Sequence, residues 1–129
     1  MEINGRDVRF FRSVLANCKV ADAAPDGDIK RFWNEQLLGG SYSVSQRAAA
    51  VIMTALSEGY EIAQHAADPK YRPRPLTEEE VMSLKYPEFN ALYNEAIAEW
   101  FDGGKRTVEP DPEPKTEKKT EEEEAGASG

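Results

Sequence analysis

The composition of the chain changes abruptly after Gly104. Residues 105–129 contain no aromatic residue, and Val108 is their only large apolar residue. Such a segment cannot bury enough apolar surface to offset the entropy of ordering its backbone, about 1–2 kcal/mol per residue. We therefore expect one folded domain over residues 1–104, long enough for a single hydrophobic core, and a disordered, charged, acidic tail over residues 105–129.

The distribution of charge excludes one class of partner. The formal net charge is −8, and the tail has eight acidic and five basic residues, so residues 1–104 have a net charge of −5. Nucleic-acid binding requires a concentrated basic surface that displaces counterions from phosphates. Because neither part is basic, we expect no nucleic-acid partner.

The order of local signals predicts a mainly α-helical fold with a short β-hairpin at its start. Residues 2–10 have the hairpin pattern, since Asn4-Gly5 suits a type I′ turn, and Val8 and Phe10 alternate with polar residues. A ribbon this small is not stable alone. We expect it to pack on a small bundle of about four to five helices.

Apolar spacing and breaking residues place these helices. The first spans residues 11–24, and its apolar face consists of Phe11, Val14, Leu15, Cys18 and either Ala21 or Ala24. Asp28 is the predicted N-cap of a second helix, which Gly39-Gly40 ends. Ser43 or Ser45 is expected to cap a long central helix that runs to about Ala67 and is covered on more than one side.

The end of the domain is predicted to contain two more helices. Thr77 and Glu80 fit a capping box before a helix of one or two turns. Tyr86-Pro87-Glu88 then opens the last helix, which has the clearest amphipathic pattern in the chain. Gly103-Gly104 is its expected C-terminal stop.

Groups that could support catalysis or metal binding are scarce. Cys18 is the only cysteine, which rules out an intrachain disulfide and a cysteine-based zinc site, and His65 is the only histidine. We interpret Cys18 as a small buried hydrophobe and His65 as a surface or boundary residue. Asp26-Gly27-Asp28 lacks the further ligands of a calcium loop. We expect no enzyme activity, no cofactor and no metal.

The sequence shows no signal for secretion or membrane insertion. The start of the chain has no basic region followed by an apolar stretch, and no apolar run approaches the roughly 20 residues that span a bilayer. We expect a cytosolic protein without a signal peptide or a membrane partner.

The aromatic residues are the remaining candidates for function. Core packing is the simpler explanation for them, but some of them could form an exposed patch that receives a partner helix. A small core seldom encloses both tryptophans completely. The candidate partner-binding residues are Phe89, Tyr93, Trp100, Phe101 and Trp33.

The two ends of the chain resemble one protein family. The chain opens with Glu2-Ile3-Asn4-Gly5-Arg6-Asp7-Val8-Arg9-Phe10, a strand, turn and strand that lead into a helix. It closes with Tyr86-Pro87-Glu88-Phe89 through Ile97, then Lys105-Arg106-Thr107-Val108-Glu109 and a Lys/Glu-rich end. This layout resembles the tail assembly chaperones of long-tailed bacteriophages, particularly those that infect Gram-positive hosts.

The resemblance implies a function without enzymatic chemistry or a cofactor. Members of this family bind and solubilise the long, apolar tape measure protein and help to recruit tail tube subunits. They act in the host cell cytoplasm and are absent from the mature virion. Many also have a longer, frameshifted form, and an A-rich slippery run could encode Lys118-Lys119. A homo-oligomer is compatible with the sequence. The alternatives are a structural phage head-tail component and a generic helical protein-interaction adaptor.

Overall fold

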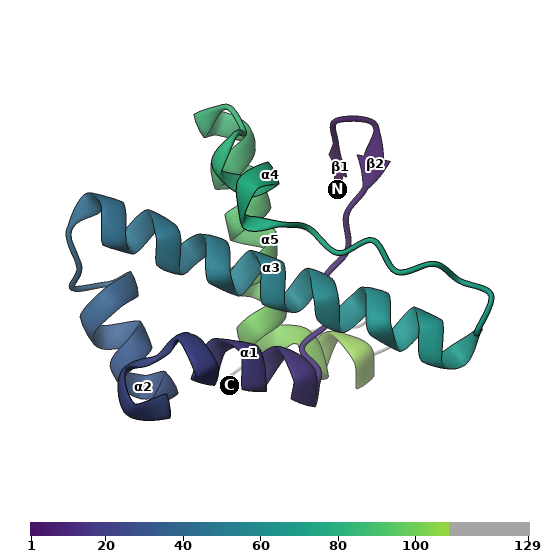
Figure 1. Ribbon diagram of the computed structural model, residues 1–129, viewed down its shortest axis with the longest axis horizontal. Coiled ribbons are helices and arrows are strands. Elements are labelled where there is room, and N and C mark those ends of the chain that lie inside the picture. The colour runs from purple at the N-terminus through teal and green to yellow at the C-terminus, as the bar shows by residue number, and fades with distance from the viewer. Residues whose placement is uncertain (109–129) are drawn as a thin grey trace, which may run out of the picture.

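The computed structural model describes residues 1–108 of the chain, and the side chains of residues 1–102. This part is mainly helical: an N-terminal antiparallel hairpin precedes five helices that pack together (Figure 1). The expected fold class is confirmed for these residues. The elements are β1 (Glu2–Ile3), β2 (Arg6–Asp7), α1 (Val14–Ala23), η1 (Pro25–Gly27), α2 (Ile29–Arg31), η2 (Phe32–Leu37), α3 (Tyr42–Ala67), α4 (Glu78–Met82) and α5 (Tyr86–Val108).

The hairpin is held by its turn and by a long-range ion pair. Asn4 and Gly5 both adopt positive φ, 52° and 81°, as the predicted type I′ turn requires. The Arg6 guanidinium donates to Glu80 Oε2 at 3.0 Å and also to the carbonyl oxygen of Arg74. The hairpin therefore contacts the segment that leads into α4.

Helix α3 is the centre of the fold, as predicted. It runs through the middle of the molecule (Figure 1) and contacts α1, η2, α4 and α5. Its buried residues include the consecutive positions Ala48, Ala49 and Ala50, which point to different sides of a helix. Its N-cap is Ser41, whose Oγ accepts from the backbone N–H of Val44. The predicted caps are wrong: Ser43 lies inside the helix, and Ser45 Oγ donates to the Leu37 carbonyl at the end of η2.

Helix α1 packs with a different face from the one its apolar residues predict. It begins at Val14, with Ser13 as N-cap, rather than at Phe11. Ala16 and Val20 are buried, whereas Val14 is 79% exposed and Cys18 is also exposed. Gly59 on α3 explains why α1 buries Ala16 and Val20, because the absence of a Cβ at Gly59 lets the start of α1 approach α3 closely. The close packing of small residues on α1 and α3 thus decides which face of α1 is buried, and the larger side chains of α1 do not.

This close approach gives a prediction that opposes ordinary helix propensity. A Cβ at residue 59 would collide with the Phe11 carbonyl oxygen and lie 2.8 Å from Ser13 Oγ. We expect Gly59→Ala to lower the free energy of unfolding by about 1–3 kcal/mol, although the same change gains about 1 kcal/mol at an open helix position. Urea unfolding measures this, with Glu58→Ala as the neighbouring control. A more stable Gly59→Ala variant would contradict the packing.

The segment between α1 and α3 contains a π-helical turn that the sequence pattern does not reveal. Asp28 caps α2 as predicted, accepting from the backbone N–H groups of Lys30 and Arg31. The chain then widens into η2, where the N–H of Leu38 donates to the Trp33 carbonyl at 2.9 Å. This wider turn buries Phe32 and Leu37 and leaves Trp33 half-buried.

The predicted capping box is present at the start of α4. Thr77 Oγ1 accepts from Glu80 N–H, and the Glu80 carboxylate accepts from Thr77 N–H. Partial burial tends to raise the pKa of Glu80, but the Thr77 hydrogen bond and the charge of Arg6 outweigh it, and the pKa lies below its ordinary value.

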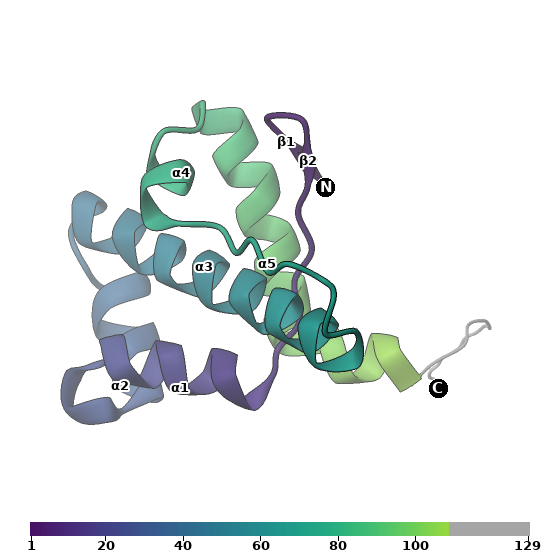
Figure 2. The ribbon, with the colours of Figure 1, turned by 45° about the vertical axis from the view of Figure 1, so that its right-hand side comes forward.

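Helix α5 passes α3 in a transverse direction, as both ribbon views show (Figures 1 and 2). It begins at Tyr86 as predicted and buries Leu92 and Ala96. The predicted stop at Gly103-Gly104 is wrong, because α5 continues to Val108. A glycine costs a helix only about 1 kcal/mol, which weakens it without ending it. The expected domain boundary stays a prediction. The disorder expected from residue 105 onward is wrong for residues 105–108, which continue α5, and residues 109–129 lie outside the described part.

Candidate partner-binding groove

The predicted partner-binding residues do not form one exposed patch. Phe89 and Trp100 are buried in the core, Tyr93 and Trp33 are half-buried against it, and Phe101 is 62% exposed. Burial raises the pKa of the Tyr93 hydroxyl, consistent with its position against the core. Phe89 and Phe101 lie twelve positions apart on α5, or about 18 Å. Two separate regions therefore have to be considered.

The first region is an aromatic cluster at the later part of α5. The Trp33 ring lies 5.8 Å from that of Trp100 and 5.2 Å from that of Phe101, measured between centroids. The Arg12 guanidinium lies 3.9 Å from the Trp100 ring centroid and donates to the Trp100 carbonyl. Burial lowers the pKa of Arg12 below its ordinary value. These contacts make Trp100 a structural residue, and Phe101 is the member of the cluster that solvent reaches most.

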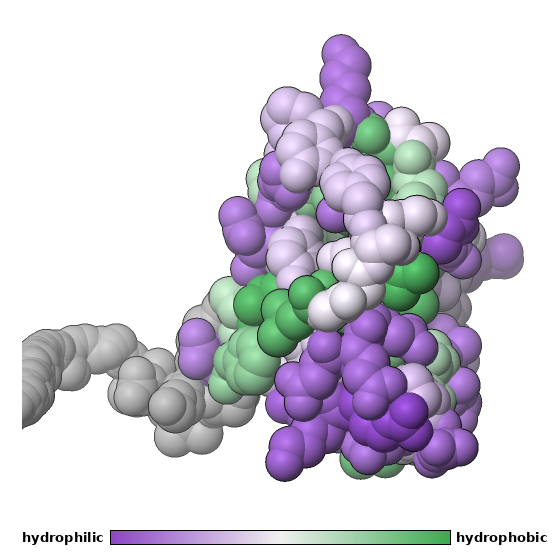
Figure 3. Space-filling model, turned by 90° about the vertical axis from the view of Figure 1, so that its left-hand side faces the viewer, coloured by the Kyte–Doolittle hydropathy of each residue, from purple (hydrophilic) through white to green (hydrophobic). Residues whose placement is uncertain are grey.

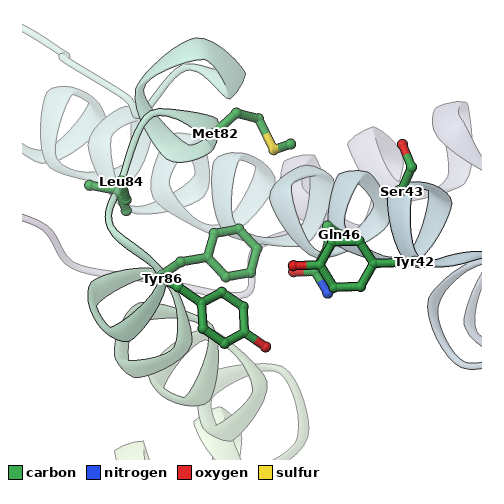
Figure 4. A pocket seen from close by; sticks show the side chains of 7 residues that line it. Tyr42, Ser43, Gln46, Met82, Leu84 and Tyr86 are labelled. Carbon is green, nitrogen blue, oxygen red and sulfur yellow. The ribbon is translucent and has the colours of Figure 1, made fainter.

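The second region is an open groove between the start of α3 and the turn from α4 to α5. Its volume is about 270 Å³. In Figure 4, Met82 and Tyr86 extend from α4 and the start of α5 toward Tyr42 and Gln46 on α3. The groove residues are Tyr42, Ser43, Gln46, Met82, Leu84, Tyr86 and Phe89.

The groove exposes large apolar side chains. Tyr42 is 71% exposed, Tyr86 56% and Met82 40%, while Phe89 is buried beneath them. A second hollow of about 340 Å³, lined in part by Val44 and Ala48, uses the same half of α3. Figure 3 shows this side of the molecule, with apolar and weakly polar residues above a strongly hydrophilic lower part. Exposed apolar residues gathered in this way are typical of a protein-interaction surface.

Sequence reasoning finds only Phe89 among the groove residues. It misses Tyr42, Met82 and Tyr86 because each stands at the end of a helix, where periodicity says little about burial. Tyr42, Met82 and Tyr86 are all large and apolar, and Tyr42 and Tyr86 also precede the buried positions of their own helices. That placement is the one signal in the sequence. A side chain there is free to contact a neighbouring element or a partner.

The reactive side chains lie elsewhere. His65 is exposed, as predicted, and its Nδ1 lies 2.8 Å from the Tyr71 carbonyl oxygen. The interpretation of Cys18 as buried is wrong, because α1 turns this residue toward solvent. Residues 1–102 contain no group of three or more acidic, histidine or cysteine side chains placed to hold a metal ion. No helix in the described part of the chain combines the length and apolarity needed to cross a bilayer.

Comparisons of the chain with known protein families, with curated proteins and with solved structures find no match.

Proposed function

We propose that this protein is a non-enzymatic phage tail assembly chaperone that binds apolar helical segments of the tape measure protein in its groove. The observation that carries the proposal is the exposed apolar groove between α3 and the α4–α5 turn. An amphipathic helix that enters such a groove is recognised through apolar residues spaced three or four positions apart. The tape measure protein, as the resemblance describes it, is long and apolar and offers many such segments.

Charge and chain layout support the same role. A net charge of −8 keeps a complex with an apolar client soluble through mutual repulsion. The resemblance of both chain ends to the phage chaperones implies the tape measure protein as the client and the tail tube protein as a second partner. On this proposal the protein acts in the host cytoplasm and leaves the assembly before the virion matures.

The groove residues provide the test. We expect the wild-type protein to suppress aggregation of the tape measure protein, measured by light scattering, and to co-purify with it. Tyr42→Ser combined with Tyr86→Ser removes two aromatic contacts, each worth about 1–2 kcal/mol in a typical interface. We therefore expect affinity to fall at least about tenfold, since 1.4 kcal/mol corresponds to a factor of ten.

The control is Val14→Ser, which removes an apolar side chain that is even more exposed but lies on α1. This variant should bind the client like the wild type. If the wild type leaves the client insoluble, the proposed function is wrong. If the double variant still binds normally, the groove is not the contact surface. Detection of the protein in mature particles by mass spectrometry would favour a structural head-tail component instead.

A further inference from the structure

The connector between α3 and α4, residues 68–77, presents a row of basic side chains. Its exposure alternates: Lys70, Arg72 and Arg74 are exposed, while Tyr71 and Pro73 are half-buried. This period of two is that of an extended backbone, which places the three basic side chains on its outer side. They line an open hollow of about 810 Å³ together with His65. We call residues 70–74 the basic strap.

The strap is fixed to α3 by hydrogen bonds from its inner side. The buried Glu61 carboxylate accepts from the Tyr71 hydroxyl and from the Arg74 backbone N–H, both at 2.8 Å. Farther along, the N–H of Leu76 donates to Ser57 Oγ at 2.9 Å. These bonds use the backbone of the strap and the Tyr71 side chain to anchor the segment to α3. The basic side chains make none of these bonds and stay on the outer side.

The strap differs in charge from the rest of the molecule. Within residues 1–102, none of its three basic side chains forms an ion pair, while most other arginines do. The Glu61 carboxylate lies beneath the strap and accepts from Tyr71 and from the Arg74 N–H, and the carboxylate of Asp68, the nearest acidic residue along the sequence, accepts from the backbone N–H of Lys70. A row of positive side chains on a protein of net charge −8 is therefore a candidate binding site for an anionic partner.

The chain itself contains a complementary segment. Glu121, Glu122, Glu123 and Glu124 form four consecutive negative charges beyond the described residues. In both ribbon views the last turns of α5 lie on the same side of the molecule as the C-terminal end of α3, where the connector begins (Figures 1 and 2). Glu124 lies sixteen positions after Val108, a stretch of chain that can span up to about 50 Å. That exceeds the length of α3, about 39 Å at 1.5 Å per residue.

We propose that the acidic segment Glu121–Glu124 docks on the basic strap of its own chain. Attachment to the same chain raises the local concentration of the glutamates at the strap to about the millimolar range, so that individually weak ion pairs suffice. Nucleic acid is the other polyanion that three basic residues could meet. The four tethered glutamates compete with nucleic acid for the strap, and the negative charge of the domain repels nucleic acid.

A paramagnetic label on the full chain tests this contact. Cys18→Ser removes the only cysteine, which is exposed, and Ala125→Cys places a nitroxide beside the glutamates. We expect the amide signals of Lys70, Tyr71, Arg72 and Arg74 to lose the most intensity. The loss should disappear on going from about 0.01 M to 1 M salt, which shortens the Debye length from about 30 Å to 3 Å.

Charge reversal gives the matched comparison. Lys70→Glu, Arg72→Glu and Arg74→Glu together should abolish the signal loss, because they remove the positive row. Lys19→Glu, Lys30→Glu and Lys85→Glu change the net charge equally at exposed positions elsewhere and should leave the loss unchanged. Equal signal loss in both triple variants would overturn the proposal.

Two further outcomes would also overturn it. In a mixture of isotope-labelled chains without nitroxide and unlabelled chains with nitroxide, strap signals should stay intact, since the contact is within one chain. Losses in that mixture would assign the contact to a second copy. If the tail label leaves the strap unaffected and a short oligonucleotide shifts the strap signals instead, the occupant is nucleic acid.

Discussion

Replacing Trp100 with alanine is expected to lower the free energy of unfolding by about 3–5 kcal/mol, the usual cost of emptying a buried aromatic site. Trp100 is only 4% exposed. Its ring packs on Trp33 and under the Arg12 guanidinium, so the variant loses an aromatic pair and a cation–π contact as well as buried area. This loss is a large part of the roughly 5–15 kcal/mol that stabilises a typical domain.

Urea unfolding measures the effect, and Phe101→Ala is the matched control on the next residue. Phe101 is 62% exposed, so its replacement should cost less than about 1 kcal/mol. Equal losses for the two variants would show that Trp100 is not in the core. The comparison also matters for function, because loss of binding by a Trp100 variant would follow from unfolding rather than from a missing contact.

Glu61→Ala is expected to lower the free energy of unfolding by about 2–4 kcal/mol. In the wild type, Glu61 Oε1 accepts from the Tyr71 hydroxyl and from the Arg74 N–H, which both belong to the basic strap. Hydrogen bonds to a charged acceptor contribute about 1.5–3 kcal/mol each, and a buried donor left unpaired adds a penalty. Glu61→Gln keeps an oxygen that can accept, so it should cost less than Glu61→Ala.

Hydrogen exchange distinguishes a local effect from a global one. In Glu61→Ala the Arg74 amide should exchange faster than in the wild type, because its acceptor is gone. The control is Glu58→Ala, one turn earlier on α3, which removes only a partly exposed ion pair with Lys19 and should cost less than about 1 kcal/mol. An unchanged Arg74 exchange rate would mean that Glu61 does not anchor the strap.

Features that depend on local chemistry could be predicted from the sequence. The Asn4-Gly5 turn, the Asp28 cap and the Thr77–Glu80 capping box all form as predicted, because each is decided by residues within four positions of one another. Spacing also identified α5 as an amphipathic helix that begins at Tyr86, since its apolar residues recur with a strong 3.6-residue period.

Tertiary structure decided which faces meet. Periodicity favoured Val14 and Cys18 on α1, but Gly59 on α3 admits the backbone of the Phe11–Ala16 region so closely that Ala16 and Val20 are buried instead. The groove formed by Tyr42, Met82 and Tyr86, and the outward row of Lys70, Arg72 and Arg74, depend on how α4 and the connector lie against α3. Residues so distant in sequence come together only through the packing of the helices, and that packing cannot be predicted from the spacing of neighbouring residues.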